Sequence, residues 1–250
     1  MLKERLVLCF PAEDRHLVQI RAAAPEYQVI DAGQERVAEE IFAADIYCGH
    51  AKVPIDWRQV VGSGRLKWIQ SSAAGLDHCL TAPVIDSPIV VTSASGVLSD
   101  QVAEHTLGLV IAVQRNFVTF WEAKKRKEFI RRPTRDVTHS TVGIVGFGGV
   151  GRRMAEVFAP LAGRIVAVDM FPVDKPDCVD QLWPPEQLDA LLAASDVVIL
   201  CLPLTPLTAG LFNAETIAKM KPGGVLVNVA RGPIVEEDAL ADALASKHLA

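Results

Sequence analysis

The sequence lacks paired cysteines, long apolar runs and an excess of positive charge. The five cysteines are odd in number and none stands at the C-x-x-C spacing of zinc and redox sites, so we interpret them as reduced thiols. No apolar run approaches the ~18 residues of a membrane helix, and residues 6–10 are too short for a signal-peptide core of ~7 to 15 residues. The 25 basic and 30 acidic residues give a net charge of −5. We therefore expect a soluble, cytoplasmic protein that binds neither nucleic acid nor a membrane.

The length of 250 residues, half of them apolar, suits one large domain or two small ones. Short apolar runs alternate with helical stretches, which predicts βαβ units and parallel sheets. We place the division near residues 95–100 and expect a first domain at 1–97 and a second at 98–250. The predicted strands are 6–10, 28–30, 45–49, 67–70, 88–92, 141–146, 164–169, 196–202 and 225–229.

A long helix is predicted at the division between the domains, with Ser99 or Asp100 as its N-cap. It is apolar nearly all round from Leu107 to Val113, and a helix without a polar face is expected to be buried on several sides. The basic run at 124–127 is predicted to form its far end. Acidic residues are interspersed there, so we favour a solvated helix end over an anion-binding patch.

A glycine-rich loop follows the strand predicted at 141–146. The residues Gly146-Phe147-Gly148-Gly149-Val150-Gly151 form a G-x-G-x-x-G between a β-branched run and a helical pattern, as in dinucleotide-binding folds. Asp169 lies 18 residues after Gly151, where an acid accepts hydrogen bonds from the adenosine ribose. A carboxylate repels a ribose 2′-phosphate and residues 170–172 include no cation, so we predict NAD rather than NADP as cofactor.

Three longer stretches resemble motifs of the D-isomer-specific 2-hydroxyacid dehydrogenases. They are residues 102–106 (VAEHT), residues 191–206 (LLAASDVVILCLPLTP) and residues 220–232 (MKPGGVLVNVARG). The resemblance implies an α/β fold with two flavodoxin-like or Rossmann-like domains, of which the NAD-binding one is doubly wound. It also implies hydride transfer between NAD and a 2-hydroxy or 2-oxo acid, and a homodimer.

The resemblance assigns roles to individual residues. Arg231 resembles the family's catalytic arginine, which binds the substrate's carboxylate and carbonyl oxygen. Its guanidinium suits a 2-oxo acid because it is a fixed donor fork that stays cationic. Ala74 and Gly75 match the loop whose backbone N–H groups hold the substrate carboxylate. The positions matching the cofactor site are Gly146, Gly148, Gly149, Val150, Gly151, Asp169, Leu202, Thr208 and Val229, and no metal site is expected.

The histidines are treated separately because none matches a catalytic position of the family. His105 is expected to be buried in the long helix, and His78 is read as structural. His50 and Lys52 follow a predicted strand on the ligand side of the sheet, so substrate contact by either is kept as a minority hypothesis beside a structural role.

The sequence departs from the family at Cys201, where relatives usually have His or Asn, and at its end. The family's glutamate and proton-donating histidine come after the equivalent of Ala250, so we expect the second domain to be C-terminally incomplete. Since losing a general acid typically costs ~10² to 10⁴ in rate, we expect the 250 residues to bind NAD and turn over slowly. A noncatalytic NAD-binding sensor and an unrelated Rossmann enzyme are the alternatives.

Overall fold

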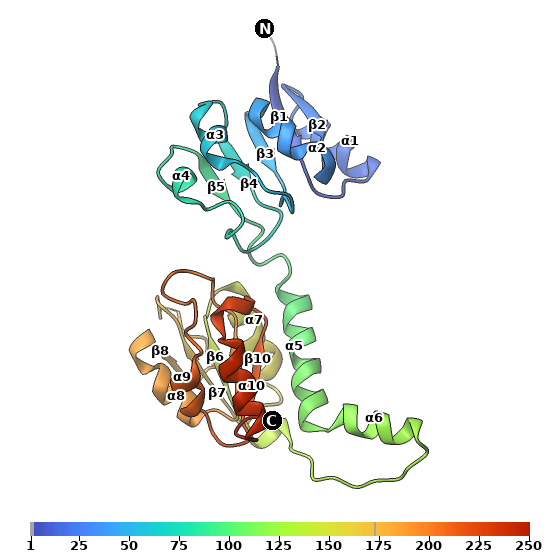
Figure 1. Ribbon diagram of the computed structural model, residues 1–250, viewed down its shortest axis with the longest axis vertical. Helices are drawn as coiled ribbons and strands as arrows, with labels where there is room; N and C mark the ends of the chain where they lie inside the picture. Colours follow the sequence, from blue (N-terminus) through green and yellow to red (C-terminus); the bar gives the residue numbers. More distant parts are fainter. Residues whose placement is uncertain (1–2, 173) are drawn as a thin grey trace. The chain divides into compact units, whose positions relative to one another are not determined.

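The computed structural model describes residues 3–172 and 174–250 and consists of two compact units, Met1–Val97 and Leu98–Ala250. Each unit contains one five-stranded sheet in which all neighbouring strands run parallel (Figure 1). The α/β class predicted from the alternating pattern is therefore confirmed. None of the helices in the described ranges combines the length and the apolar content needed to cross a bilayer.

The first unit has the strand order β2-β1-β3-β4-β5, which is the flavodoxin-like order. One face of the sheet packs its apolar side chains against α2, α3 and α4, and the β1 end of the other face packs against α1. The elements are β1 (Glu4–Leu8), α1 (Asp14–Ala23), β2 (Tyr27–Asp31), α2 (Gly33–Glu40), a 3₁₀ turn (Ile41–Ala43), β3 (Ile46–Cys48), α3 (Trp57–Gly62), β4 (Trp68–Gln70), α4 (Ala82–Ile85) and β5 (Val90–Thr92).

The second unit has the order β10-β9-β6-β7-β8. Counted from β8 this is the third, second, first, fourth and fifth strand of the unit, which is the Rossmann order. Its elements are α5 (Ser99–Gln114), α6 (Phe117–Lys125), a 3₁₀ turn (Val137–His139), β6 (Thr141–Val145), α7 (Gly149–Phe158), β7 (Arg164–Val168), β8 (Gln181–Trp183), a 3₁₀ turn (Pro185–Gln187), α8 (Leu188–Ala194), β9 (Val197–Leu200), α9 (Ala214–Ala218), β10 (Val225–Asn228), a 3₁₀ turn (Gly232–Ile234) and α10 (Glu237–Ala245).

Helices cover both faces of the second sheet, as expected for a doubly wound domain. Side chains of α5 and α7 pack on one face and side chains of α8, α9 and α10 on the other. The strands between them are almost continuously apolar and buried, because a parallel strand with helices on both sides exposes neither face. This packing makes the carboxyl ends of the strands the accessible edge.

The long helix predicted from Ser99 to the basic run differs from its prediction in three ways. It is divided into α5 and α6, with Asn116 in the left-handed conformation (φ +54°) between them. Helix α5 begins at Ser99, so Leu98 is the N-cap and neither predicted residue caps the helix. The buried Ser99 hydroxyl has no hydrogen-bond partner among the described residues, and Asp100 forms an ion pair with Arg153. Only one stripe of the helix is buried (Ala103, Thr106, Val110 and Gln114). Leu109, Val113 and His105 are exposed, so the expected burial on several sides is wrong for this chain.

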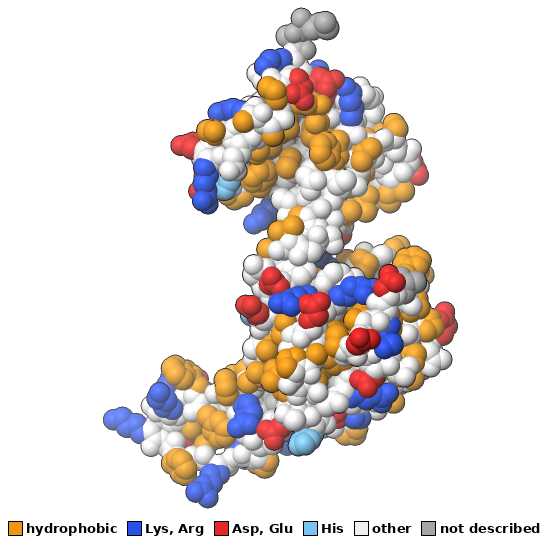
Figure 2. Space-filling view, turned by 180° about the vertical axis from the view of Figure 1, so that it is seen from behind, with side chains coloured by type: hydrophobic (Ala, Val, Ile, Leu, Met, Phe, Trp, Pro, Cys, Tyr) orange, Lys and Arg blue, Asp and Glu red, His pale blue; other side chains and the backbone are white. Residues whose placement is uncertain are grey.

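The chain continues from α5 into an arm formed by residues 115–136, which contains α6. Phe117, Val118, Trp121 and Phe129 are all more than half exposed, with Phe129 at 87%. Figure 2 shows basic and hydrophobic side chains next to each other on this arm. Eight basic and three acidic residues give it a net charge of +5, whereas the whole chain has −5. The arm therefore exposes an apolar surface with basic side chains around it.

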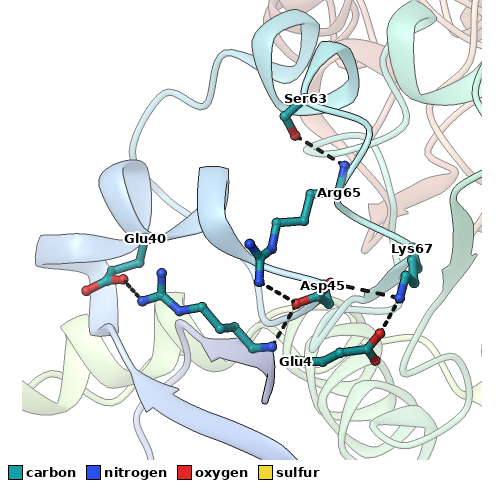
Figure 3. A network of polar contacts seen from close by, with 7 residues as sticks. Glu4, Glu40, Asp45, Ser63, Arg65 and Lys67 are labelled. Atoms are coloured by element: carbon teal, nitrogen blue, oxygen red, sulfur yellow. Dashed lines mark hydrogen bonds and ion pairs between the residues drawn. The ribbon is translucent and has the colours of Figure 1, made fainter. Parts of the chain in front are cut away.

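The amino edge of the first sheet is held by a network around Asp45, which precedes β3 (Figure 3). The Asp45 carboxylate accepts the Arg5 N–H of β1 at 2.8 Å and pairs with the Arg65 guanidinium at 3.0 Å. Arg5 pairs in turn with Glu40, and Lys67 with Glu4. The buried Asp45 is thus tied to β1 and to the residues that enter β4.

Candidate active site

The glycine-rich loop connects β6 to α7 in the geometry that a dinucleotide-binding turn requires. Gly146 has φ +94°, and a Cβ there would lie 2.8 Å from the Leu202 nitrogen. A Cβ on Gly151 would lie 2.2 Å from the Gly146 oxygen, so α7 packs against the strand only because this residue is glycine. No atom lies within 4 Å of a Cβ built on Gly148. The loop is closed toward the sheet and open at Gly148.

This open position suits a pyrophosphate. Gly148 is the N-cap of α7, and Gly149 and Val150 form its first turn. The N–H groups of a first turn have no partner within the helix, and together with the helix dipole they attract an anion. A Cβ at Gly148 would fill the space through which the backbone approaches that anion. The residues present therefore fit the pyrophosphate of a dinucleotide.

Asp169 follows β7 and its carboxylate is fixed by two backbone groups. Oδ2 accepts the Phe147 N–H at 2.6 Å and Oδ1 accepts the Phe171 N–H at 2.9 Å. Phe147 belongs to the glycine-rich loop, so the acid and the loop form one hydrogen-bonded unit. Each carboxylate oxygen has a second lone pair, which is the acceptor that a ribose hydroxyl needs.

Arg152 is a residue of this region that the sequence reasoning missed. Its guanidinium lies 5.1 Å from the centre of the Phe147 ring and donates to the Asp174 carbonyl at 2.8 Å. It thereby connects the first turn of α7 to the loop after β7. The sequence does show an arginine directly after Gly151. Its contact with Asp174, 22 residues further along the chain, appears only in the folded structure.

The other predicted cofactor residues lie at the ends of β9 and β10 in the same sheet. The Leu202 nitrogen faces Gly146, and Val229 packs on the core beside Cys201. The Thr208 hydroxyl donates to the Pro203 carbonyl at 2.7 Å and accepts the Thr205 N–H at 2.8 Å, so it closes the turn after β9.

Cys201 lies directly under the glycine-rich loop. Its thiol donates to the Gly146 carbonyl at 2.9 Å. Burial, with a smaller contribution from the Asp169 charge, raises the pKa of Cys201 to about 12. The side chain is therefore a neutral thiol that packs against the loop rather than a nucleophile.

Arg231 leaves the sheet after β10 in a turn that Asn228 organises. The Asn228 side chain accepts the Ala230 N–H at 3.0 Å and donates to the Arg231 carbonyl at 2.9 Å. The half-buried Arg231 guanidinium donates to the Ala230 carbonyl at 2.8 Å. Asn228 is a second positioning residue that sequence reasoning missed, because its role appears only once the turn is formed.

The predicted carboxylate loop follows β4 in the first unit. The buried Ser71 hydroxyl accepts the Ala73 N–H at 3.0 Å, and the Ala73 carbonyl accepts the Ala94 N–H at 3.1 Å. Ala74 is exposed and Gly75 is partly exposed. The loop is thus anchored at its start, and its small residues are accessible. Ala74 and Gly75 belong to the first unit, and all other predicted site residues belong to the second.

A Rossmann-ordered sheet with a glycine-rich loop after its first strand, an aspartate after its second and an arginine after its last has the arrangement expected of a dinucleotide-dependent oxidoreductase. Residues 107–250 match the family model described as "D-isomer specific 2-hydroxyacid dehydrogenase, NAD binding domain". The chain belongs to this family, whose members are NAD-dependent dehydrogenases of D-2-hydroxy acids, and it contains their NAD-binding domain.

Relatives of known name agree with this assignment. The chain is 33% identical over 218 residues to the glycerate dehydrogenase of Methylorubrum extorquens, covering 84% of this chain and 66% of the relative. Among solved structures, a D-isomer specific 2-hydroxyacid dehydrogenase from Xanthobacter autotrophicus in complex with NADPH is 28% identical, with a TM-score of 0.79, covering 99% and 79%. The NAD-dependent formate dehydrogenase of Staphylococcus aureus in complex with NAD is 25% identical, with a TM-score of 0.79, covering 98% and 79%.

Proposed function

We propose that this chain transfers a hydride reversibly between NAD(H) and a D-2-hydroxy acid or its 2-oxo acid. The observation that carries the proposal is the shared edge of the second sheet. The glycine-rich loop follows β6 there and the Arg231 turn follows β10, with the end of β9 between them. We assign residues 1–97 to substrate binding and residues 98–250 to NAD binding.

The proposed roles follow from the chemistry of each group. NAD, when bound, accepts or supplies the hydride. Gly146, Gly148 and Gly151 admit its pyrophosphate to the start of α7, and Asp169 holds the adenosine ribose. Leu202, Thr208 and Val229 line the space beside the loop. These contacts orient the cofactor. The substrate is bound by other residues, which are Arg231 and the loop at Ala74 and Gly75.

Arg231 and the loop at Ala74 and Gly75 act on the substrate. A guanidinium binds a carboxylate and the adjacent carbonyl oxygen through two parallel N–H donors. As the hydride adds to the carbonyl carbon, the C=O π electrons move to the oxygen, and the guanidinium stabilises the negative charge that develops there. The proton that completes the hydroxyl group comes from solvent water, and the reverse reaction returns it. The backbone N–H groups of Ala74 and Gly75 hold the carboxylate from the first unit, where small side chains leave the chain accessible.

The test combines binding and turnover. Glyoxylate, hydroxypyruvate, pyruvate and 3-phosphohydroxypyruvate are assayed with NADH for turnover. D-2-hydroxy acids are titrated calorimetrically into the NADH-loaded chain, where they cannot react, for binding. Arg231→Ala should weaken substrate binding and lower kcat/KM about 10³-fold, given the size of oxyanion and charged hydrogen-bond effects. Arg231→Lys should also be poor, because an ammonium cannot replace the two-pronged contact.

Arg164→Ala is the matched control. Arg164 is an exposed arginine at the amino end of β7, on the opposite edge of the same sheet, and its loss should leave binding and turnover unchanged. A chain that binds NADH but no 2-oxo or 2-hydroxy acid would favour the noncatalytic NAD-binding protein. Near-normal turnover by Arg231→Ala would make the arginine a structural turn residue.

We also propose that the chain acts as a cytoplasmic homodimer whose interface includes α6. The exposed Phe117, Val118 and Trp121 form an apolar face beside the open side of α5. The arm has a charge of +5 and the rest of the chain −10, so a second copy offers a surface of complementary charge. Sedimentation should give a dimer for the natural sequence and a monomer for Trp121→Glu; a monomer for both contradicts this proposal.

A further inference from the structure

The turn after β3 lies where the direction of strand addition reverses in the first sheet. β2 is added on one side of β1 and β3 on the other, so the reversal falls between β1 and β3. Open parallel sheets bind ligands outside the carboxyl ends of the strands at such a point. Residues 49–52 occupy this position and include two groups that bind anions, the His50 imidazole and the Lys52 ammonium.

Two side chains from other elements fix this turn. The Gln34 amide of α2 donates to the Cys9 carbonyl at 2.6 Å and to the His50 carbonyl at 3.0 Å, and its oxygen accepts the Lys52 N–H at 2.7 Å. The Tyr47 hydroxyl accepts the Ala51 N–H at 2.8 Å. Tyr47 is fully buried, and burial raises its pKa, so the hydroxyl keeps its proton.

The turn also lies unusually close to β1. Gly49 has φ +146°, and a Cβ there would lie 2.4 Å from the Cys9 sulfur, so only glycine allows this approach. The Gly49 carbonyl accepts the Ser72 N–H at 3.3 Å. This bond joins the turn to the start of the loop that contains Ala74 and Gly75. The His50 turn and the predicted carboxylate loop are therefore neighbours in one unit.

The His50 ring is held by a second imidazole. It stacks on the His78 ring with centroids 3.9 Å apart and an interplanar angle of 22°. The stacking limits the rotation of the His50 side chain, so the imidazole is held in one orientation beside the turn. The Lys52 side chain is exposed and forms no ion pair with any described residue. Both groups are thus positioned and available.

We propose that His50 and Lys52 bind a second anionic group on the substrate, so the site selects 2-hydroxy and 2-oxo acids with a charged side chain. The proposal rests on the proposed function, because the loop at Ala74 and Gly75 is taken to hold the first carboxylate. The ligand class is a short-chain acid with a side-chain carboxylate or phosphate. His78 and Gln34 act as positioning residues for this pair.

The experiment compares acids of similar length by titration calorimetry on the full chain loaded with NADH, to which a 2-hydroxy acid cannot donate a hydride. D-2-hydroxybutyrate has a neutral side chain, D-malate a carboxylate and D-3-phosphoglycerate a phosphate. At least one anionic acid should bind about 10- to 100-fold more tightly than D-2-hydroxybutyrate, the ratio expected for charged hydrogen bonds. Lys52→Met and His50→Asn should each remove most of this preference while leaving D-2-hydroxybutyrate within about twofold. Comparing malate with phosphoglycerate distinguishes the two anions.

Lys3→Met is the matched control. Lys3 is an exposed lysine just before β1, so it removes the same charge from the amino edge of the same sheet and should leave the preference intact. Hydrogen exchange of peptides from the first unit reports that each variant is folded there, and Lys52→Gln repeats the test with a polar replacement. Equal binding of all three acids by the natural sequence, or equal losses in Lys3→Met and Lys52→Met, overturns the inference. Binding of none of them overturns the proposed function itself.

Discussion

The first sheet reverses its direction of strand addition between β1 and β3, and the second reverses it between β6 and β9. At the second reversal the chain contributes backbone: a glycine-rich loop that is open at Gly148, and the N–H groups at the start of α7. At the first it contributes side chains on a turn that Gln34 and Tyr47 fix in place. The topology of an open parallel sheet predicts where a site lies, while the chemistry of that site depends on which residues follow the strands.

The largest effects on NADH binding are expected from substitutions in the glycine-rich loop of the second sheet. Gly148→Ala adds a Cβ where no atom lies within 4 Å, so thermal unfolding should be unchanged. NADH affinity should fall about 10- to 100-fold, because the methyl group occupies the approach to the pyrophosphate. Fluorescence titration with NADH and calorimetric scanning check the two readouts on the same protein.

Gly151→Ala is the companion variant at the third glycine. Its Cβ would lie 2.2 Å from the Gly146 carbonyl oxygen, which is backbone and cannot rotate away. We expect the free energy of unfolding to fall by about 1–3 kcal/mol, the usual cost of overpacking. NADH binding should be lost as well. Unchanged NADH affinity in Gly148→Ala would show that the open side of the loop does not face the cofactor.

The glycine-rich loop was predictable because its requirements are local: a turn, a close approach and a helix start within six residues. The place of Asp169 at the end of the second strand of this sheet was predictable from its spacing, and its ribose contact stays a prediction. Arg152, Gln34 and Asn228 were not predictable, because each acts on backbone atoms that the sequence does not place. The Gln34 amide reaches His50, 16 residues away, and Arg152 reaches Asp174, 22 residues away. Such contacts depend on tertiary structure and leave no periodic signal.

The strand β8 (Gln181–Trp183) was missed for a related reason. Three residues after a loop rich in Asp and Pro show no alternation, and their extended conformation depends on pairing with β7, where Val166 lies opposite Gln181. The helix α5 was predicted in place, but its burial was not. An apolar surface is visible in sequence, whereas the sequence does not say whether the same chain covers it.

A smaller effect on cofactor binding is expected at Asp169, the residue proposed to hold the adenosine ribose. Asp169→Ala removes a group that hydrogen-bonds Phe147 and Phe171 and that repels a 2′-phosphate. The ratio of NADH to NADPH affinity should fall about 10-fold, since one charged contact is worth about 1.4 kcal/mol or more. Asp177→Ala, in the same loop, is the control. Equal affinities for the two cofactors in the natural sequence would remove the basis of the NAD preference.

At the amino edge of each sheet, an aspartate before one strand accepts a backbone N–H from the neighbouring strand. Removing either carboxylate gives the smallest effect that we predict. Asp45 precedes β3 and accepts the Arg5 N–H of the neighbouring strand, and Asp196 precedes β9 and accepts the Thr141 N–H at 2.8 Å. The Asp45 side chain is 8% exposed and the Asp196 side chain 35%. The same hydrogen bond should therefore contribute more to stability at Asp45.

The pKa of Asp45 shows the sign of the effect. Burial alone would raise it, but the Arg5 N–H, the Arg65 guanidinium and the Lys67 charge together lower the pKa below its usual value. A carboxyl group with a lowered folded-state pKa stabilises the protein above its unfolded pKa, near 4, and loses that stabilisation as the pH falls. Acid should therefore loosen the first unit as Asp45 becomes protonated.

Hydrogen exchange read on separate peptides tests this prediction in each unit. Asp45→Asn should lower the protection of β1 and β3 at pH 7 by about 1–2 kcal/mol, the size of one charged hydrogen bond partly kept by the amide oxygen. It should also flatten the loss of protection below pH 4. Peptides of the second unit serve as the internal control, and Asp196→Asn, at the more exposed site, should cost less. A larger loss of protection from Asp196→Asn than from Asp45→Asn would mean that burial does not decide how much this hydrogen bond contributes to stability.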